Sequence, residues 1–299
     1  MPGVGTSLDT GLNWGSPDTI SVEEAKPLKH WYAESHGEGD LELCPFVPFF
    51  IDHLPGSFKR YRQYMYTITQ QPNAITQSVA VLLFLSYYMR VRDSRGVLYE
   101  MIAARDAGIT RQQVLNVIEF TFLTSGPSSA NAMAHLGSTY FEQWDPSGDD
   151  EATADWPSGW TLGDGGAHRS SFDFMTAALS EDDWSVLTRW YRLAGQEIPS
   201  YVQFLAKWRG DMLKVVRHRQ EHMYANLRLP IQMLPLFTLH QGVIECNRRA
   251  VREGAVAARR VGVTKEQVVQ TVLWAFLHGS EPTLNDVSEE LDPILEAWS

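Results

Sequence analysis

The feature that most limits how this chain can fold is a segment that occurs twice. Residues 100–123 align without gaps on residues 254–277, a shift of 154 positions, and nine of the 24 aligned pairs are identical. Average composition would give about one or two identities over this length. We therefore expect the chain to contain two related units.

The physical content of the repeat is a helix, a sharp turn and a second helix. Gly108 and its counterpart Gly262 stand where the end of a helix favours a left-handed residue. Two positions later, Thr110 and Gln113 have the spacing of a capping box that opens the next helix, and the second copy preserves both residue types. Neither half shows convincing runs of alternating apolar and polar residues, so we predict an all-α fold.

One segment interrupts the helical pattern between the two copies. Residues 145–166 contain acids, glycines and prolines but no Lys or Arg, which is typical of a solvated connector. Its two tryptophans, Trp156 and Trp160, indicate that it packs along the surface. The predicted division is an N-terminal arm with a short helix (1–43), a first helical module (44–144), an acidic linker (145–166) and a second helical module (167–299).

Composition excludes several classes of protein. The chain has 36 Asp and Glu against 25 Lys and Arg, a net charge of −11, which repels nucleic acid and anionic lipid. Its two cysteines, Cys44 and Cys246, have no disulfide-framework, metal-ligand or redox spacing. The longest nearly unbroken apolar stretch, Val79 to Met89, is much shorter than the roughly 20 residues of a membrane helix, and no signal peptide is evident. We expect a soluble, cytoplasmic protein with no membrane partner.

The succession of a buried helix, Ala-Ala-Arg, a Gly-(Ile/Val)-Thr turn and an amphipathic helix resembles the carboxymuconolactone decarboxylase and alkylhydroperoxidase-D-like superfamily. The resemblance covers about 44–145 and 199–285. It implies two all-helical family modules fused as an internal pseudo-dimer. Because family modules assemble as oligomers, it also implies a homo-oligomer.

The chain departs from the family at the reactive positions. Peroxidase members carry a CxxC motif followed four residues later by a histidine. Counted back from the glycine turns, these positions hold Asp93, Gly96 and Glu100 in the first module and Asn247, Ala250 and Gly254 in the second. Thiol peroxidase chemistry needs an attacking thiolate and a resolving partner, so we do not expect it here. No cofactor is expected.

The predicted catalytic residues lie on the apolar helix of the second module. His240 stands in the middle of that helix, where a neutral imidazole can act as a general acid or base. The alternative is a core histidine that hydrogen-bonds a neighbouring helix. Glu245 follows on the same helix and, if buried, would have a raised pKa suited to proton transfer. Its alternative is an ion pair with Arg248 or Arg249.

The candidates for substrate binding are Tyr87, Arg90, Arg92, Glu119 and His278. Arg90 and Arg92 close the apolar run of the first module, where a guanidinium can bind a substrate carboxylate. An ion pair with Asp93 or Glu100 is their alternative. The last two candidates are polar residues on the helices that follow the two turns. They would line a pocket between the modules, and an exposed helix face is the other interpretation.

A competing motif is His218-x-x-Glu221-His222. Two histidines four residues apart meet on one helix face and can bind zinc, and inverted zincins use this order. A third, acidic ligand would have to come from Glu281, Glu289 or Glu290. We expect no metal, and keep this motif as the alternative.

These observations favour a divergent carboxymuconolactone-decarboxylase-like enzyme. It would use acid/base chemistry on a small organic acid, a lactone or an aromatic-derived metabolite, as a decarboxylase-like lyase or a lactone-acting enzyme. A zinc-dependent hydrolase is one alternative. A non-catalytic helical binding or scaffold protein is another, and a pocket near His240 filled by Phe237 and Trp274 would favour it.

Overall fold

The computed structural model describes residues 11–36, 44, 46–70, 74–144, 153–163, 169–193, 197–279 and 281–298. Throughout these ranges the regular structure is helical, and the only strand-like pairing is one isolated bridge between Leu162 and Pro230. The predicted all-α class is confirmed. Within the same ranges, no helix combines the length and the apolar character needed to cross a membrane.

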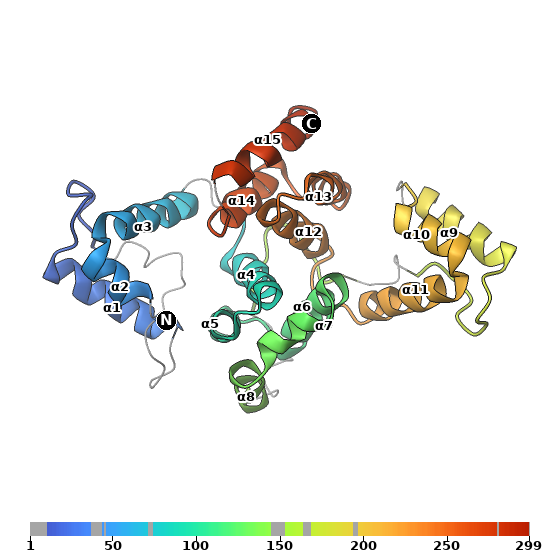
Figure 1. The fold of residues 1–299 in the computed structure, drawn as a ribbon, viewed down its shortest axis with the longest axis horizontal. Helices are drawn as coiled ribbons and strands as arrows, with labels where there is room; N and C mark the ends of the chain where they lie inside the picture. The colour runs from blue at the N-terminus through green and yellow to red at the C-terminus, as the bar shows by residue number, and fades with distance from the viewer. Residues whose placement is uncertain are drawn as a thin grey trace. The chain divides into compact units, whose positions relative to one another are not determined.

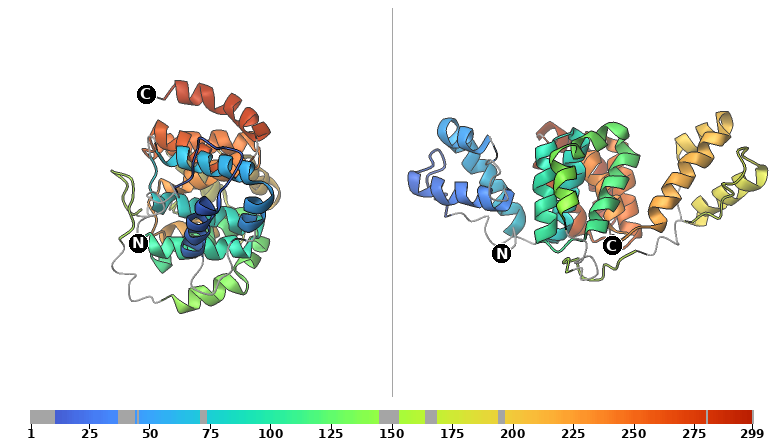
Figure 2. Two further views of the ribbon diagram at one scale, coloured as in Figure 1. Left: turned by 90° about the vertical axis from the view of Figure 1, so that its left-hand side faces the viewer. Right: turned by 90° about the horizontal axis from the view of Figure 1, so that it is seen from below.

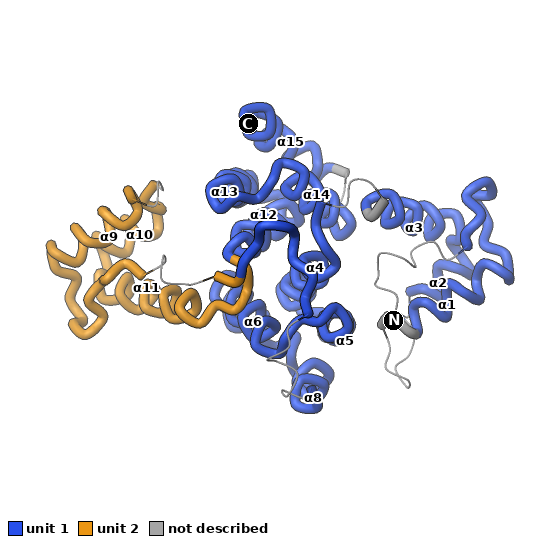
Figure 3. Tube along the Cα trace, turned by 180° about the vertical axis from the view of Figure 1, so that it is seen from behind, with its two compact units in different colours: residues 1–161, 231–299 blue, residues 162–230 orange. Residues whose placement is uncertain are grey.

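Contacts divide the chain into two compact units (Figure 3). The first unit is formed by residues 1–161 and 231–299, and the second by residues 162–230. The predicted second module, 167–299, therefore contributes to both units. The predicted boundaries at residues 43 and 166, and half of the linker, lie outside the described residues.

The first unit contains the helices that come before the second unit in the chain and those that come after it. Before it come α1 (Val22–His36), α2 (Phe46–His53), α3 (Pro55–Gln70), α4 (Gln77–Val91), α5 (Ser94–Asp106), α6 (Arg111–Ser125), α7 (Pro127–Ala130), the short 3-10 helix η1 (Asn131–Met133) and α8 (Leu136–Gln143). After it come α12 (Met233–Ile244), α13 (Arg248–Arg260), α14 (Lys265–Phe276) and α15 (Glu281–Glu296). The second unit consists of α9 (Glu181–Leu193), α10 (Ser200–Trp208) and α11 (Gly210–Ala225).

The core of the first unit is built around α4 and α12, which pack against each other (Figures 1 and 2). α4 is the most apolar long helix before the linker, and α12 is the most apolar long helix after it. Nearly every residue of α12 from Met233 to Val243 is buried. Each is followed by a helix that packs closely against it, α5 after α4 and α13 after α12. A helix that is apolar on all sides belongs at the centre of a bundle, as predicted.

The helix boundaries recur at the spacing of the sequence repeat. A shift of 154 positions carries α5 onto α13 at both ends. Gly108 and Gly262 have φ values of 73° and 80°. Thr110 and Thr264 both open complete capping boxes, with the backbone nitrogen of the glutamine at the third helix position 3.2 Å from the threonine hydroxyl oxygen in each. The predicted helix, glycine turn and second helix are therefore confirmed in both copies.

The described part of the linker lies against the first half of the chain. The N–H of Asp155 donates to Ser78 Oγ at 3.0 Å, and the hydroxyl of Thr76 donates to the carbonyl of Asp155 at 2.5 Å. Trp160 is buried. The predicted packing of this segment along the surface is confirmed at Asp155 and Trp160.

Helices α1–α3 form a second layer beside α5 and α14. Trp31 and Tyr32 of α1 pack in one apolar cluster with Phe58 of α3 and Tyr99 of α5. The hydroxyl of Tyr64 on α3 donates to the carbonyl of Leu273 on α14 at 2.9 Å. This layer does not pack completely against the core, and a cavity remains between the layer and the core.

Candidate active site

The cavity has a volume of about 380 Å³ and lies between α1, α3, α4, α5 and the end of α14. Its size falls within the range of about 300–1,000 Å³ typical of small-molecule sites. Eight of its 22 lining residues are aromatic: Trp31, Tyr32, Phe46, Tyr61, Phe84, Tyr88, Tyr99 and Trp274. Asp93, Arg95 and Glu100 are its charged residues. A flat, apolar ligand suits the aromatic part of this lining, because aromatic rings pack well in offset and edge-to-face geometries.

Glu100 is the buried acid of this cavity. It lies on α5, is 8% exposed, and makes no hydrogen bond or ion pair with another described residue. Burial raises the pKa of Glu100 well above its ordinary value. The side chain is therefore a neutral carboxylic acid at a pH where an exposed glutamate is ionised, and it can donate a proton.

The turn between α4 and α5 positions the residues of one part of the cavity wall. Arg92 ends α4 in the left-handed conformation, with φ 63°. Asp93 then caps α5 by accepting hydrogen bonds from the N–H groups of Arg95 and Gly96, at 3.0 and 3.1 Å. The ring of Tyr88 covers Gly96 so closely that a Cβ there would lie 2.1 Å from Tyr88 Cδ1. Only glycine at this position allows the tyrosine to line the cavity.

Another part of the wall is formed by Trp274 and His278, near the end of α14, with Phe84 of α4. The ring centroids of Phe84 lie 5.2 Å from Trp274 and 4.8 Å from His278. Burial lowers the pKa of His278 to about 3, so its imidazole is neutral near pH 7. Trp274 Nε1 and His278 Nδ1 are both buried and have no hydrogen-bond partner among the described residues.

His240 lies behind this wall, on α12. It is 1% exposed, and its ring centroid is 6.0 Å from that of Phe84 and 6.3 Å from that of His278. Burial, together with the nearby His278, lowers the pKa of His240 well below its ordinary value. Neither ring nitrogen has a hydrogen-bond partner in the described structure, so the expected bond of a core histidine to a neighbouring helix is not found.

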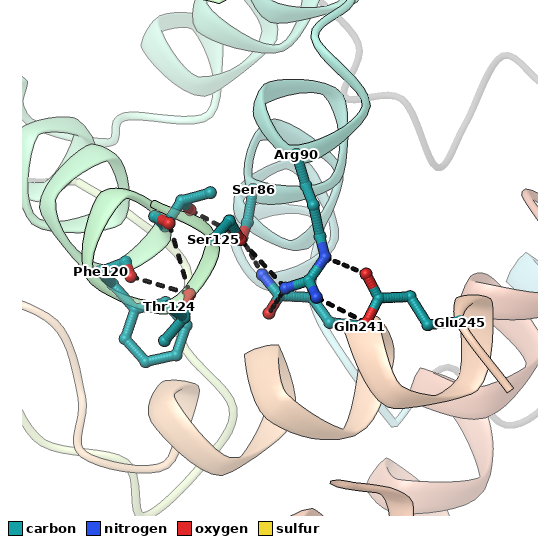
Figure 4. A network of polar contacts seen from close by, with 8 residues as sticks. Ser86, Arg90, Phe120, Thr124, Ser125, Gln241 and Glu245 are labelled. Atoms are coloured by element: carbon teal, nitrogen blue, oxygen red, sulfur yellow. Dashed lines mark hydrogen bonds and ion pairs between the residues drawn. The ribbon is translucent and has the colours of Figure 1, made fainter. Parts of the chain in front are cut away.

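Glu245 belongs to a different network, which joins α4 to α12 (Figure 4). Its carboxylate forms an ion pair with Arg90, whose Nη2 lies 2.5 Å from Oε2. Arg90 also donates to Gln241 at 2.8 Å and to Ser125 at 3.0 Å, and Gln241 in turn donates to Ser86 at 2.7 Å. His240 takes no part in this network, so Glu245 is not its hydrogen-bond partner.

This network corrects the ion pairs considered for Glu245 and Arg90. Arg248 pairs with Asp286 and Glu289, and Arg249 pairs with Glu253, so neither pairs with Glu245. Arg90 pairs with neither of the acids that follow it on the chain. Both alternatives considered only neighbours in the sequence, whereas the actual partners come from opposite halves.

Of the predicted site residues, only His278 lines the cavity. Tyr87 is half-buried beside it, with ring centroids 4.1 Å apart. Arg92 is exposed and donates to Ser128 at 2.9 Å. Glu119 is half-buried on α6, away from the cavity lining. Glu100 lines the cavity but was not among the predicted site residues. Its place at the histidine position of the family motif could have identified it as a candidate.

The second half has glycines where the first half has Tyr88 and Glu100. These are Gly242 and Gly254, at the same shift of 154 positions. A Cβ on Gly254 would lie 2.8 Å from Leu239 N, and one on Gly242 would lie 2.9 Å from Val251 N. The backbones of α12 and α13 therefore touch at the place where α4 and α5 carry the side chains of the cavity wall.

The zinc motif has other contacts. His218 and His222 are exposed, and the ring of His218 stacks on Phe174 with centroids 4.7 Å apart. Glu221 points elsewhere and accepts hydrogen bonds from Ser170 and Arg217. Glu289 and Glu290 pair with arginines of α13, and the side chain of Glu281 lies outside the described residues. In the described ranges, no group of three His, Cys, Asp or Glu side chains is placed to hold a metal ion.

Comparison of the chain with protein-family models, with curated proteins and with solved structures found no match. The resemblance to the carboxymuconolactone decarboxylase superfamily therefore stays a prediction from its motif. The fold and the cavity show a helical protein with a cavity lined in part by aromatic side chains.

Proposed function

We propose that the chain is an enzyme that carries out acid/base chemistry on a small ring compound bound in the cavity of the first half. The observation that carries this proposal is Glu100, a buried carboxyl without a charged partner in the wall of an aromatic cavity. Perturbed carboxyls in clefts are typical of catalytic acids. A divergent carboxymuconolactone-decarboxylase-like lyase or lactone-acting enzyme fits this arrangement.

Glu100 is the proton-transferring group in this proposal, in place of His240 and Glu245. The neutral carboxylic acid donates its proton to an oxygen or carbon of the bound substrate and recovers one at the end of the cycle. The neutral imidazole of His278 lines the same cavity and is able to accept or donate a hydrogen bond. Glu100 stands at the position of the family histidine, so the proposed acid replaces that residue. The recurring helix boundaries support an internal duplication that forms a pseudo-dimer.

The test is solvent deuterium exchange. The purified protein is incubated in D₂O with a panel of lactones, cyclic keto acids and aromatic carbonyl compounds, and exchange or turnover is followed by ¹H NMR. We expect protein-dependent exchange or conversion of at least one compound. Glu100→Gln should reduce its rate by at least about 100-fold, the usual contribution of a general acid or base.

Matched variants locate the acid. Glu119→Gln is the control, because Glu119 does not line the cavity, and it should retain the rate. Glu245→Gln and His240→Gln should also retain most of it. Full activity of Glu100→Gln together with loss of activity in His240→Gln would refute the role of Glu100 and restore the assignment made from the sequence. Binding of panel compounds without any exchange would indicate a binding protein.

A further inference from the structure

Helices α10 and α11 of the second unit carry an exposed apolar surface, here named the α10–α11 face. It consists of Tyr201, Phe204 and Trp208 on α10 and Met212 and Val215 on α11, each between 39% and 62% exposed. Spacings of three and four residues place the members from each helix on one side of it. The two rows meet where α10 ends at Trp208 and α11 begins, with Met212 in its first turn.

The same two helices bury a different side in the core of their own unit. Val202 and Leu205 of α10 and Leu213 of α11 pack in one apolar cluster with Leu187 and Tyr191 of α9. Both helices are therefore apolar on two sides. A surface helix of a globular protein normally has one apolar side and exposes polar residues on the other, so the α10–α11 face calls for a covering partner.

The first half of the chain shows the same surface in use. A shift of 154 positions carries α2 and α3 onto α10 and α11 within one residue at every end. The five positions of the α10–α11 face then correspond to Val47, Phe50, Leu54, Phe58 and Tyr61. All of these except Leu54 pack in the apolar cluster that α1–α3 form with α5. The face is therefore the repeat counterpart of a packing surface.

The residue of α5 that joins this cluster has a charged counterpart in the second half. Tyr99 of α5 belongs to the cluster, and the corresponding residue of α13 is Glu253. Glu253 is exposed and forms an ion pair with Arg249 of the same helix. Covering such a pair with apolar side chains would remove both charges from water, which is costly. The partner of the α10–α11 face must therefore be another apolar surface.

The size of the face fits a second copy of the chain. Because an aromatic side chain can bury about 150–250 Å², three aromatic residues that are about half exposed, with Met212 and Val215, present about 400–500 Å². A standard interface buries about 800 Å² per partner and is about 65% apolar in homodimers, which corresponds to about 500 Å² of apolar surface. One such face on each subunit is therefore enough for a stable dimer.

The charge of the second unit also permits self-association. Residues 162–230 contain eight acidic and nine basic residues, a net charge of +1, whereas the whole chain has a net charge of −11. Like charges oppose association, and this unit carries almost none of the negative charge of the chain. Two copies can therefore approach through their second units without strong repulsion.

We propose that the α10–α11 face is a homodimer interface, in which it packs against the same face of a second copy around a two-fold axis. In such an isologous contact the same patch serves both subunits, so the face covers itself. Phe204 and Trp208 are its most exposed members, and buried aromatic residues carry most of the binding energy of an interface. The inference does not depend on the proposed activity or on Glu100.

The test is the mass of the full chain in solution, measured by sedimentation velocity. We expect a dimer, twice the chain mass of 33.8 kDa. A concentration of about 50 μM is suitable, because interfaces of standard size have Kd values at or below the micromolar range. Phe204→Glu combined with Trp208→Glu should weaken dimerisation at least about 100-fold, because two charges would be buried on each side.

A matched control separates the face from exposed apolar residues in general. Met175→Glu introduces the same charge at an exposed methionine of the second unit that lies outside α10 and α11, and it should leave the dimer intact. Phe204 and Trp208 are both exposed, so their replacement keeps the core of the unit, and circular dichroism checks the helix content. If the double variant loses helix, Trp208→Ser alone takes its place and should also weaken the dimer.

Charge-complementary variants test whether identical faces meet. Phe204→Lys combined with Trp208→Lys should also be monomeric alone. Mixed with the double glutamate variant it should form a dimer, because a negative face then meets a positive one. A face that packs on a different surface of the second copy would gain nothing from the mixture.

A parent dimer that is lost in both double variants and restored in their mixture would support the inference. A parent protein that is monomeric at about 50 μM, where an interface of this size would be occupied, would overturn it. A dimer that survives in the double glutamate variant would also overturn it, since the subunits would then meet elsewhere. A mixture that stays monomeric would refute the packing of identical faces.

Discussion

Replacement of Glu100 by glutamine should change how the stability of the protein depends on pH. The substitution keeps the size and the neutrality of the side chain but removes its ionisation. In the folded protein, burial raises the pKa of Glu100 well above the ordinary value of 4.5. In the unfolded chain, the same carboxyl ionises at its ordinary pKa.

The direction and the magnitude follow from this difference. Below pH 4.5 the carboxyl is protonated in both states, so its effect on stability does not change with pH. Above pH 4.5 the unfolded state loses the proton while the folded state retains it, so stability falls until the pH passes the folded-state pKa. Within that window the unfolding equilibrium constant of the parent should rise about tenfold per pH unit relative to that of Glu100→Gln.

The measurement is urea unfolding of both proteins at pH 4.5, 5.5 and 6.5, followed by circular dichroism. His240 and His278 have lowered pKa values, so they destabilise the folded state as the pH falls below 6.5. Their effect is present in both proteins and cancels in the ratio of the two unfolding constants. A ratio that stays constant over these pH values would refute a buried, neutral Glu100. A ratio that decreases with pH would show that the carboxylate form is the one stabilised.

Three further substitutions test the cavity wall and the contact between the two halves. In Gly96→Ala the new Cβ would lie 2.1 Å from Tyr88 Cδ1, so the tyrosine ring must move. We expect a stability loss of about 1–3 kcal/mol in urea unfolding and at least tenfold weaker binding of the panel compound that the parent protein converts. Unchanged stability and affinity would contradict this geometry. Arg90→Met removes three hydrogen-bonded partners and should cost about 1–2 kcal/mol in urea unfolding. Glu245→Gln, at an ion pair whose carboxylate is 37% exposed, should cost less than about 1 kcal/mol, and equal losses would contradict the network.

The parts of the fold that were predicted correctly depend on local signals. Gly108 and Thr110 define a helix end and a helix start within three residues, and their copies do the same. The apolar run of α4 likewise indicates a central helix without any knowledge of its neighbours. The separate unit of residues 162–230 could not be predicted this way, because it is defined by which helices contact one another and not by the sequence of any one helix.

The candidate site was harder to predict because its residues are buried by distant segments. From the sequence, Glu100 was considered only as an ion-pair partner of Arg90 or Arg92. Its burial results from the packing of α1–α3 against α5, which no periodicity in α5 reveals. Arg90 and Glu245 are far apart in the chain, so their ion pair depends on the contact between α4 and α12.

The two halves share their helices and caps but differ in how closely their central helices approach. At Gly242 and Gly254, a Cβ would come within 3.0 Å of the backbone of the facing helix, so α12 and α13 are held together there by the absence of side chains. At the corresponding places α4 and α5 carry Tyr88 and Glu100, both of which line the cavity. A glutamate at position 254 would therefore not create a second site, because α12 and α13 would first have to separate. The second half instead contributes two side chains to the cavity of the first half. Trp274 of α14 and His278 of the turn after it line that cavity, and the close packing of the second half holds them in place.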